Sequence, residues 1–512
     1  MLKIKGCGFT IEEIKSFLCG NVEVTIDSKA LVCVKKSRAF VEKKLSSDEP
    51  IYSINTGFGA LAREKIPHKD LARLQENLIL SHAVGVGDPF PDSISRLIML
   101  LRANVLAGGY CGVRPELIKL VVDMINLEII PVIPSQGSVG ASGDLAPLAH
   151  LALALIGRGD VSYKGKIVAA SRALKAAGLK PIRLEAKEGL ALINGTQVMT
   201  ALGLALLVKL ENLLRVADIV GALSIEGDRA SRRPFDARIH KLRPHPGQIA
   251  TASNIRKLIE GSGIIASHAN CKRVQDPYSF RCIPQVHGAV KDAVSYARDV
   301  IMREVGSTTD NPLIFADDNE IISGGNFHGE PLAIALDTAG IAVSELGNIS
   351  ERRVAILIAP LSGEVRAKFL VPHAGINSGL MIPHVVMSSL VSENKVLAHP
   401  ASVDSIPTSG GQEDHVSMGA ISARKALAIA GNVETILAIE LFAACQAIEF
   451  QLKYGKPGKG TCAVYDLVRK GVSPIENDRE YRYDIVRCVE LVKSGSVVAA
   501  AERVCGKLEV KS

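Results

Sequence analysis

Tryptophan is absent from this chain of 512 residues, and aromatic residues together make up only 4% of it. Hydrophobic residues still account for 47%, so we expect a large core packed mainly by aliphatic side chains. A strong charge of one sign is also lacking, because the net charge is only +7 and no long basic run occurs. Nucleic-acid binding needs a concentrated basic surface, so the sequence argues against a nucleic-acid partner.

Closely spaced cysteines are lacking as well. The ten cysteines are scattered, and the N-terminus has no apolar segment typical of a signal peptide, so we expect reduced thiols and a cytoplasmic protein.

Uncharged runs of membrane length are missing too, because residues 199–221 and 416–448 each contain four charged residues. Burying those charges in lipid is costly, so we interpret both segments as long helices in a soluble core.

Hydrophobic periodicity predicts a mainly α protein. A helix is expected after Thr10, which has the capping-box spacing with Glu13, and alternation predicts a strand over residues 22–26. Another helix is expected from an Asp70 N-cap to a stop at Gly85. Further helices are predicted over residues 93–109, 115–128, 145–157, 190–225, 284–305, 329–358 and 413–453.

Three domains are expected from these elements. Residues 1–200 would form a mixed, mainly helical N-terminal domain, residues 201–450 a central bundle of long helices, and residues 451–512 a small helical segment after a polar stretch. Because the long helices are apolar on nearly every face, they are expected to bury against partner subunits in an oligomer.

One glycine-rich loop is the most informative segment. Residues 137–150 run Gly-Ser-Val-Gly-Ala-Ser-Gly-Asp-Leu-Ala-Pro-Leu-Ala-His. The glycine spacing is G-x-x-G-x-x-G, and no Gly-Lys-Ser/Thr follows, so a nucleotide or phosphate site is not expected. Asp144 stands where an N-cap would start the helix over residues 145–157, and Pro147 falls in the first turn, where proline is tolerated. The positive end of that helix would then face residues 141–143.

This loop resembles the aromatic amino-acid ammonia-lyases, in which an Ala-Ser-Gly tripeptide cyclises into a methylidene-imidazolone. The resemblance implies that Ala141, Ser142 and Gly143 form this cofactor, with attack of the glycine nitrogen on the alanine carbonyl and loss of two waters. Asp144 would assist the proton transfers. Such an electrophile suits the reaction, because an amino group leaves poorly and the β-proton is only weakly acidic. No metal or nucleotide is implied.

The resemblance runs from about residue 50 to about residue 490. It implies that Tyr52, in Ile51–Gly59, removes the β-proton; a glycine-flanked mobile loop is a plausible carrier for such a base. Tyr278 is implied to be a further catalytic residue, which faces the ring and assists its chemistry. Other matched positions imply substrate contacts: Asn194 for the carboxylate or the cofactor oxygen, Gln275 in the site, Arg281 as a two-pronged carboxylate clamp, Asn326 and Phe327 beside the cofactor, and Met381 in the pocket wall. Residues 307–312 also match and are expected to be structural.

Two positions bear on the substrate. His82 follows Ser81, the pair that histidine lyases carry, although its helical spacing alone favours an ordinary buried histidine. Glu413 stands where the phenylalanine and tyrosine enzymes tend to carry glutamine. A carboxylate can accept a hydrogen bond from an imidazole N–H, whereas a phenyl ring would leave it buried and unpaired; locally, Glu413 could equally be a partner of a helix N-terminus.

The resemblance implies conversion of L-histidine to trans-urocanate and ammonia. The alternative within the same chemistry is a tyrosine ammonia-lyase or aminomutase. Pro383-His384 and Gly410-Gly411 depart from the Ala-Gln and Ala-Asn of typical histidine lyases. The implied fold is a long-helix bundle of the fumarase/aspartase-like type, assembled as a homotetramer with shared active sites.

Three other classes are weighed against this interpretation. The fumarase and argininosuccinate lyase group uses a Gly-Ser-Ser-x-Met-Pro loop that is missing here. A zinc knuckle is suggested faintly by His268, Cys271, Cys282 and His287, but the spacing is loose and no metal is expected. A non-enzymatic scaffold would not need the complete set of reactive residues.

Overall fold

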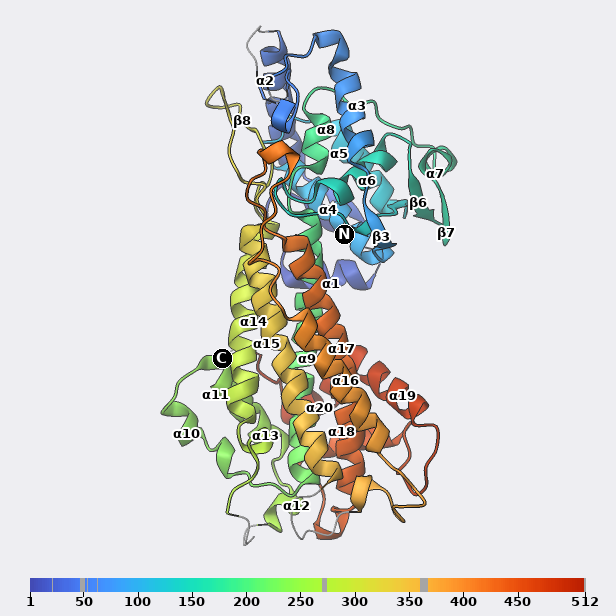
Figure 1. The fold of residues 1–512 in the computed structure, drawn as a ribbon, viewed down its shortest axis with the longest axis vertical. Helices are drawn as coiled ribbons and strands as arrows, with labels where there is room; N and C mark the ends of the chain where they lie inside the picture. The colour runs from blue at the N-terminus through green and yellow to red at the C-terminus, as the bar shows by residue number, and fades with distance from the viewer. Residues whose placement is uncertain are drawn as a thin grey trace. The chain divides into compact units, whose positions relative to one another are not determined.

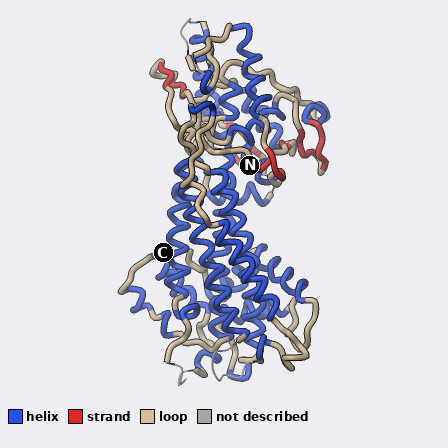
Figure 2. Tube along the Cα trace, in the orientation of Figure 1, coloured by secondary structure: helices blue, strands red, loops and turns tan. Residues whose placement is uncertain are grey.

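The computed structural model describes residues 1–20, 22–46, 51–52, 54–61, 63–268, 274–359 and 367–510. Helices dominate and strands are short (Figure 2), which confirms the predicted mainly α class. The chain divides into two compact units. The first comprises Met1–Ala205, Arg298–Asp337 and Pro400–Arg424, and the second comprises Leu206–Ala297, Thr338–His399 and Lys425–Ser512. The three consecutive domains expected from the sequence divide the chain differently and stay a prediction.

The first unit contains the helices drawn in blue to green in the part of Figure 1 labelled α1 to α8, and within it the buried helix α4 packs against α1, α2 and α5. Its helices are α1 (Ile11–Cys19), α2 (Ser28–Leu45), α3 (Leu71–His82), α4 (Asp92–Ala107), α5 (Pro115–Asn126), α6 (Leu145–Leu155), α7 (Ala170–Ala176) and α8 (Glu188–Ile193). The capping box predicted for α1 is present, because Thr10 and Glu13 cap each other's backbone amides.

Strands in this unit form small sheets at the edges of the helices. Parallel β1 (Leu2–Ile4) and β2 (Val24–Ile26) pair Leu2 with Val24, which confirms the last three residues of the strand predicted over residues 22–26. The antiparallel pairs are β3 (Val86–Pro89) with β5 (Pro134–Gln136), β4 (Ile130–Pro131) with β6 (Asp160–Tyr163), β6 with β7 (Lys166–Ala169), and β8 (Leu313–Phe315) with β9 (Glu320–Ile322).

The described part of the chain contains five long helices where the sequence predicted a helical bundle. They are α9 (Gln197–Gly227), α14 (Ile283–Val305), α15 (Glu330–Ile358), α16 (Met381–Leu397) and α17 (Gly419–Glu449). The second unit adds α10 (Ala237–Lys241), α11 (Pro246–Leu258), α12 (Gly263–Ala266), α13 (Tyr278–Arg281), α18 (Lys459–Arg469), α19 (Tyr481–Lys493) and α20 (Ser496–Cys505). Three of the long helices, α9, α15 and α17, could cross a membrane by length and composition alone, but 67% to 72% of each apolar window is buried inside the protein.

Several predicted helix boundaries are wrong. Asp70 belongs to the short 3₁₀ helix η2 (His68–Asp70), and its side chain makes no cap to α3, which ends at His82. The helix expected over residues 190–225 is interrupted at Asn194–Thr196, because Gly195 takes a φ of +150° that no helix allows. The helix expected from residue 413 begins only at Gly419, since the preceding residues form a loop.

Buried charges tie the long helices of the second unit together. Arg353 on α15 and Glu440 on α17 are both inaccessible, with Nη2 and Oε2 2.7 Å apart, and Ser224 on α9 also donates to Glu440 at 2.7 Å. Nearby, Asp218 on α9 accepts hydrogen bonds from Lys291 on α14 at 2.6 Å. These contacts place α9, α14, α15 and α17 side by side, as Figure 1 shows for their second-unit portions.

Glu440→Gln is expected to destabilise the protein by about 3–5 kcal/mol, because the Arg353 guanidinium stays buried without its counter-charge. Denaturant unfolding of the two proteins measures the difference. Asp123→Asn is the matched control, since Asp123 pairs with the exposed Lys119 on α5 and should change stability by less than about 1 kcal/mol. A Glu440→Gln protein as stable as that control would show that the buried pair contributes nothing.

Candidate active site

The Ala-Ser-Gly tripeptide lies in the loop between β5 and α6, where only small residues fit. Ala141 is 4% exposed and packs against Val416 and Met418. Gly143 has a φ of +73°, and a Cβ added there would lie 2.1 Å from the carbonyl oxygen of Gly195. A side chain at Gly143 is therefore excluded by both the backbone angle and the neighbouring carbonyl.

Asp144 caps a helix, but a different one from the helix predicted. Its side chain makes no cap to α6, which it precedes directly. Oδ2 instead accepts hydrogen bonds from the amides of Val198 and Met199 in the first turn of α9, both at 3.0 Å. Oδ1 accepts a hydrogen bond from the Ser138 hydroxyl at 2.9 Å. Burial raises the pKa of Asp144 to about 6, although these hydrogen bonds oppose the rise.

Loops from three distant parts of the chain close around this tripeptide. The Gly140 carbonyl accepts the Gly329 amide at 3.1 Å and the Ser417 hydroxyl at 3.0 Å. The Asp144 amide donates to the Gly195 carbonyl at 2.7 Å. The predicted motifs around residues 194–197, 323–330 and 411–416 are thus bound to the same loop, within the first unit.

Glu413 lies directly over the tripeptide. Its Oε1 accepts the Ser142 hydroxyl at 2.9 Å, and its Oε2 accepts the hydroxyls of Thr408 at 2.6 Å and Ser409 at 2.9 Å. The structure therefore brings together the two residues that the sequence singled out for cofactor and substrate. Thr408 and Ser409 were not predicted, and no signal in the sequence distinguishes them from ordinary loop hydroxyls.

The Tyr52 loop and His82 belong to the same unit. Tyr52 is half-buried, and its hydroxyl accepts the Gly59 amide at 3.3 Å. The short 3₁₀ helix η1 (Gly59–Leu61) that follows packs against η5 (Ser409–Gly411), which precedes Glu413. Burial lowers the pKa of His82, while the Leu78 carbonyl and the charge of Glu413 oppose the shift. Glu413 thus lies within electrostatic range of His82.

Asn194 is held in a buried polar cluster that the sequence did not reveal. Its Nδ2 donates to Asp310 Oδ1 at 3.2 Å, and its carbonyl accepts from the fully buried Arg102 at 2.9 Å. Asp310 also pairs with Lys187 at 2.7 Å, with both side chains inaccessible. The expectation that residues 307–312 are structural agrees with this contact. The inaccessible lysine could not be recognised, because lysine is usually exposed.

Asn326 and Phe327 stand on the loop that Gly329 ties to the tripeptide. Asn326 is exposed, and its Nδ2 lies 3.5 Å from the Thr308 carbonyl, while Phe327 is half-buried. The next residue, His328, contacts the backbone carbonyl of His415 at 3.2 Å. This contact joins the loop to the one that carries Glu413.

The remaining predicted residues belong to the second unit. Gln275, Arg281 and Met381 are partly or fully exposed, and Tyr278 is 71% exposed. The Arg281 guanidinium carbon lies 4.4 Å from the centre of the Tyr278 ring. A cavity of about 470 Å³ opens beside Arg281 and is lined by Arg233, His268, Gln275 and Asp276, among others.

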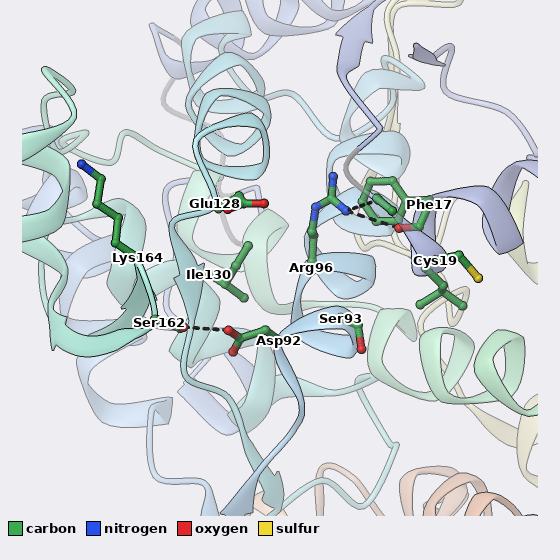
Figure 3. Close-up of a pocket in the computed structure, with 12 residues that line it drawn as sticks. Phe17, Cys19, Asp92, Ser93, Arg96, Glu128, Ile130, Ser162 and Lys164 are labelled. Atoms are coloured by element: carbon green, nitrogen blue, oxygen red, sulfur yellow. Dashed lines mark hydrogen bonds between the residues drawn. The ribbon is translucent and has the colours of Figure 1, made fainter. Parts of the chain in front are cut away.

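A second cavity, of about 320 Å³, involves none of the predicted site residues (Figure 3). Arg96 of α4 stacks on Phe17 at 4.2 Å and donates to the carbonyls of Phe17 and Gly20, so it fastens the C-terminal end of α1. On the opposite wall, Ser162 donates to Asp92 at 2.7 Å. Arg96, Ser162 and Asp92 are thus engaged in holding the fold.

The weak zinc pattern has an ordinary structural environment where it can be traced. Cys271 lies outside the described residues. His287 is inaccessible, with Nδ1 2.9 Å from Asp218 Oδ1 and Nε2 3.4 Å from Arg353. Among the residues that the structure describes, no group of three or more histidine, cysteine, aspartate or glutamate side chains could hold a metal ion.

Residues 9–470 match the family described as aromatic amino acid lyase. The chain belongs to this family. A histidine ammonia-lyase of Myxococcus xanthus (strain DK1622) is 49% identical over 497 residues, 97% of each chain. The crystal structure of histidine ammonia-lyase from Trypanosoma cruzi has a TM-score of 0.90 and 41% identity, covering 98% of this chain and 95% of that chain. A tyrosine aminomutase from Streptomyces globisporus reaches a TM-score of 0.93 at 36% identity, covering 99% and 100%.

The raised pKa of Asp144 predicts a pH dependence of the lyase's stability. The folded state binds this proton more tightly than the unfolded state, so the group's contribution is present below about pH 4 and is lost as pH rises through about 6. Relative to Asp144→Asn, the wild type should lose about 3 kcal/mol between pH 4 and pH 7. Denaturant unfolding across this range tests it, with Asp123→Asn as the control. Parallel stability curves for wild type and Asp144→Asn would contradict the assignment.

Proposed function

We propose that this lyase removes ammonia from L-histidine, giving trans-urocanate. The observation that carries the proposal is the 2.9 Å contact between the Glu413 carboxylate and the Ser142 hydroxyl. It sets an acceptor for an imidazole N–H beside the tripeptide from which the family's electrophile would form. An acceptor at this position favours a ring that carries a donor.

The tripeptide fits a methylidene-imidazolone. Gly143 is packed too closely for any side chain, Ala141 is buried among apolar neighbours, and the Ser142 hydroxyl stands beside a carboxylate. This group supplies an electron sink that activates the amino acid for loss of ammonia. Asp144 would hold or release a proton near neutral pH, and it is linked through Ser138 to the Gly143 carbonyl, 3.4 Å from the Ser138 hydroxyl. These residues would serve the cyclisation that makes the cofactor.

The remaining predicted residues divide the handling of the substrate. We assign removal of the β-proton to Tyr52, and capture of the carboxylate to Arg281, whose planar guanidinium can form two parallel hydrogen bonds with it. Glu413 and His82 would face the imidazole ring. As the resemblance implies, Tyr278 would face the cofactor ring and assist its chemistry, and Asn194 would bind the substrate carboxylate or the cofactor oxygen. Gln275, Asn326, Phe327 and Met381 are assigned to the walls of the site.

Histidine is favoured over tyrosine and phenylalanine by the cost of stranded polar groups. A site built to hydrogen-bond a polar ring can reject one that lacks the partner by about 10⁴ or more. Phenylalanine would leave Oε1 of Glu413 without a donor once the Ser142 hydroxyl is lost. Tyrosine is longer than histidine and offers a single hydroxyl as a donor. Because the chain is also similar to a tyrosine aminomutase, tyrosine is the competing substrate to test.

Wild-type protein should convert histidine to urocanate faster than it converts tyrosine to coumarate or phenylalanine to cinnamate, followed by ultraviolet absorbance. Its intact mass should lie two waters below the sequence mass. Ser142→Ala should show neither the activity nor that mass deficit, because it has no hydroxyl to lose. Faster turnover of tyrosine would overturn the assignment of histidine as the substrate. Full activity of Ser142→Ala would overturn the proposal that the tripeptide forms the cofactor.

We further propose a cytoplasmic homotetramer in which neighbouring subunits contribute to each site. The exposure of Tyr278 and of apolar residues such as Val274, 96% exposed, supports this, since large exposed apolar groups mark contact surfaces. Mixing and refolding Tyr52→Phe with Arg281→Lys subunits should restore part of the activity that each variant lacks. A monomeric mass by light scattering, or no complementation, would contradict shared sites.

A further inference from the structure

The loop that ends at Glu413 has an unusual backbone. Thr408 and Glu413 close it with paired amide-to-carbonyl hydrogen bonds of 2.9 and 3.3 Å. Between them, Ser409, Gly410 and Gly411 take φ values of +52°, +65° and +88°. Glycine adopts these angles without strain, but serine does not. Ser409 therefore occupies a position where glycine would be the more relaxed residue.

The side chains of this loop account for that choice. The hydroxyls of Thr408 and Ser409 both donate to Oε2 of Glu413, at 2.6 and 2.9 Å. Oε1 faces the opposite way and accepts the Ser142 hydroxyl at 2.9 Å. Two donors on one oxygen fix the side-chain torsions of Glu413 and leave the other oxygen over the tripeptide.

We propose that Thr408 and Ser409 are positioning residues that aim Oε1 of Glu413 at the imidazole of the substrate. This rests on the proposed function, because Glu413 is taken to bind the substrate ring. The Ser142 hydroxyl is lost if the tripeptide cyclises, so Oε1 is then left to a donor from the substrate. Glutamate has three side-chain torsions, and a carboxylate on a surface loop without these donors would sample several orientations.

Thr408→Val keeps the shape of threonine and removes only the hydroxyl. It should lower kcat/KM for histidine by about 10- to 100-fold, the range for a lost hydrogen bond to a charged group. The loss should fall mainly on kcat, because a displaced ring misaligns the β-proton. Thr408→Ser restores the hydroxyl and should stay within about threefold of wild type. Gln412→Ala is the matched control in the same loop, since Gln412 is exposed.

Ser409→Gly separates positioning from stability. It relieves the positive-φ strain, so the melting temperature should stay equal or rise, while kcat for histidine should fall by about 5- to 30-fold. A merely structural serine would give the reverse, with activity kept. Loss of activity in Ser409→Gly together with a lowered melting temperature would overturn the positioning role.

A double-mutant cycle decides whether Thr408 acts through Glu413. In a Glu413→Ala background, Thr408→Val should change kcat/KM by less than about twofold, since the group it positions is already gone. An undiminished effect there would overturn the proposal. The two-water mass deficit should persist in Thr408→Val and Ser409→Gly, which excludes failed cofactor formation as the cause; its loss would also overturn the proposal.

The two levels of inference fail differently. If wild type does not act on histidine, the proposed function falls and the positioning role falls with it. If wild type is active on histidine while Thr408→Val and Ser409→Gly match it, only the positioning role is overturned.

Discussion

The site depends on one buried carboxylate. Asp144 follows the tripeptide directly and reaches across to the first turn of α9, where it accepts two backbone amides that no helical carbonyl can satisfy. Its other oxygen holds Ser138, which begins the same loop. The loop is thereby fixed to the start of a 31-residue helix, and the positive end of α9 compensates part of the cost of burying the acid.

The close approach of Gly143 and Gly195 follows from that attachment. The Asp144 amide donates to the Gly195 carbonyl, and the two glycine backbones pair without room for a side chain. The break between α8 and α9 at residues 194–196 is the counterpart of this contact. A continuous helix would have no exposed amides for Asp144 and no carbonyl facing the loop, so the interruption is what allows the site to form.

Two inaccessible ion pairs fix segments of the chain against each other. Arg353 with Glu440 joins α15 to α17, and Lys187 with Asp310 joins the start of α8 to a loop; each pair is supported by further hydrogen bonds. With no tryptophan and few aromatic rings, aliphatic surfaces alone would let long helices slide past one another. Paired charges specify one register, because any other arrangement leaves a charge buried without its partner. The lyase chemistry needs that accuracy, since its loops come from distant segments.

The sequence by itself determined the mainly α fold, most long helices, the reactive tripeptide and the family. Hydrophobic periodicity is a local property, and the Ala-Ser-Gly-Asp pattern is contiguous, so both can be found without coordinates. Only the tertiary structure decided which helix Asp144 caps, where α9 and α17 begin, and which hydroxyls hold Glu413. Thr408 and Ser409 are close to Glu413 in the sequence, but their contacts depend on a loop conformation that the sequence pattern did not predict. The contacts of Asp144 with Val198 and of Ser142 with Glu413 join segments more than fifty residues apart. No local pattern carries such long-range contacts, because they arise only when the competing helix ends and loops are packed together.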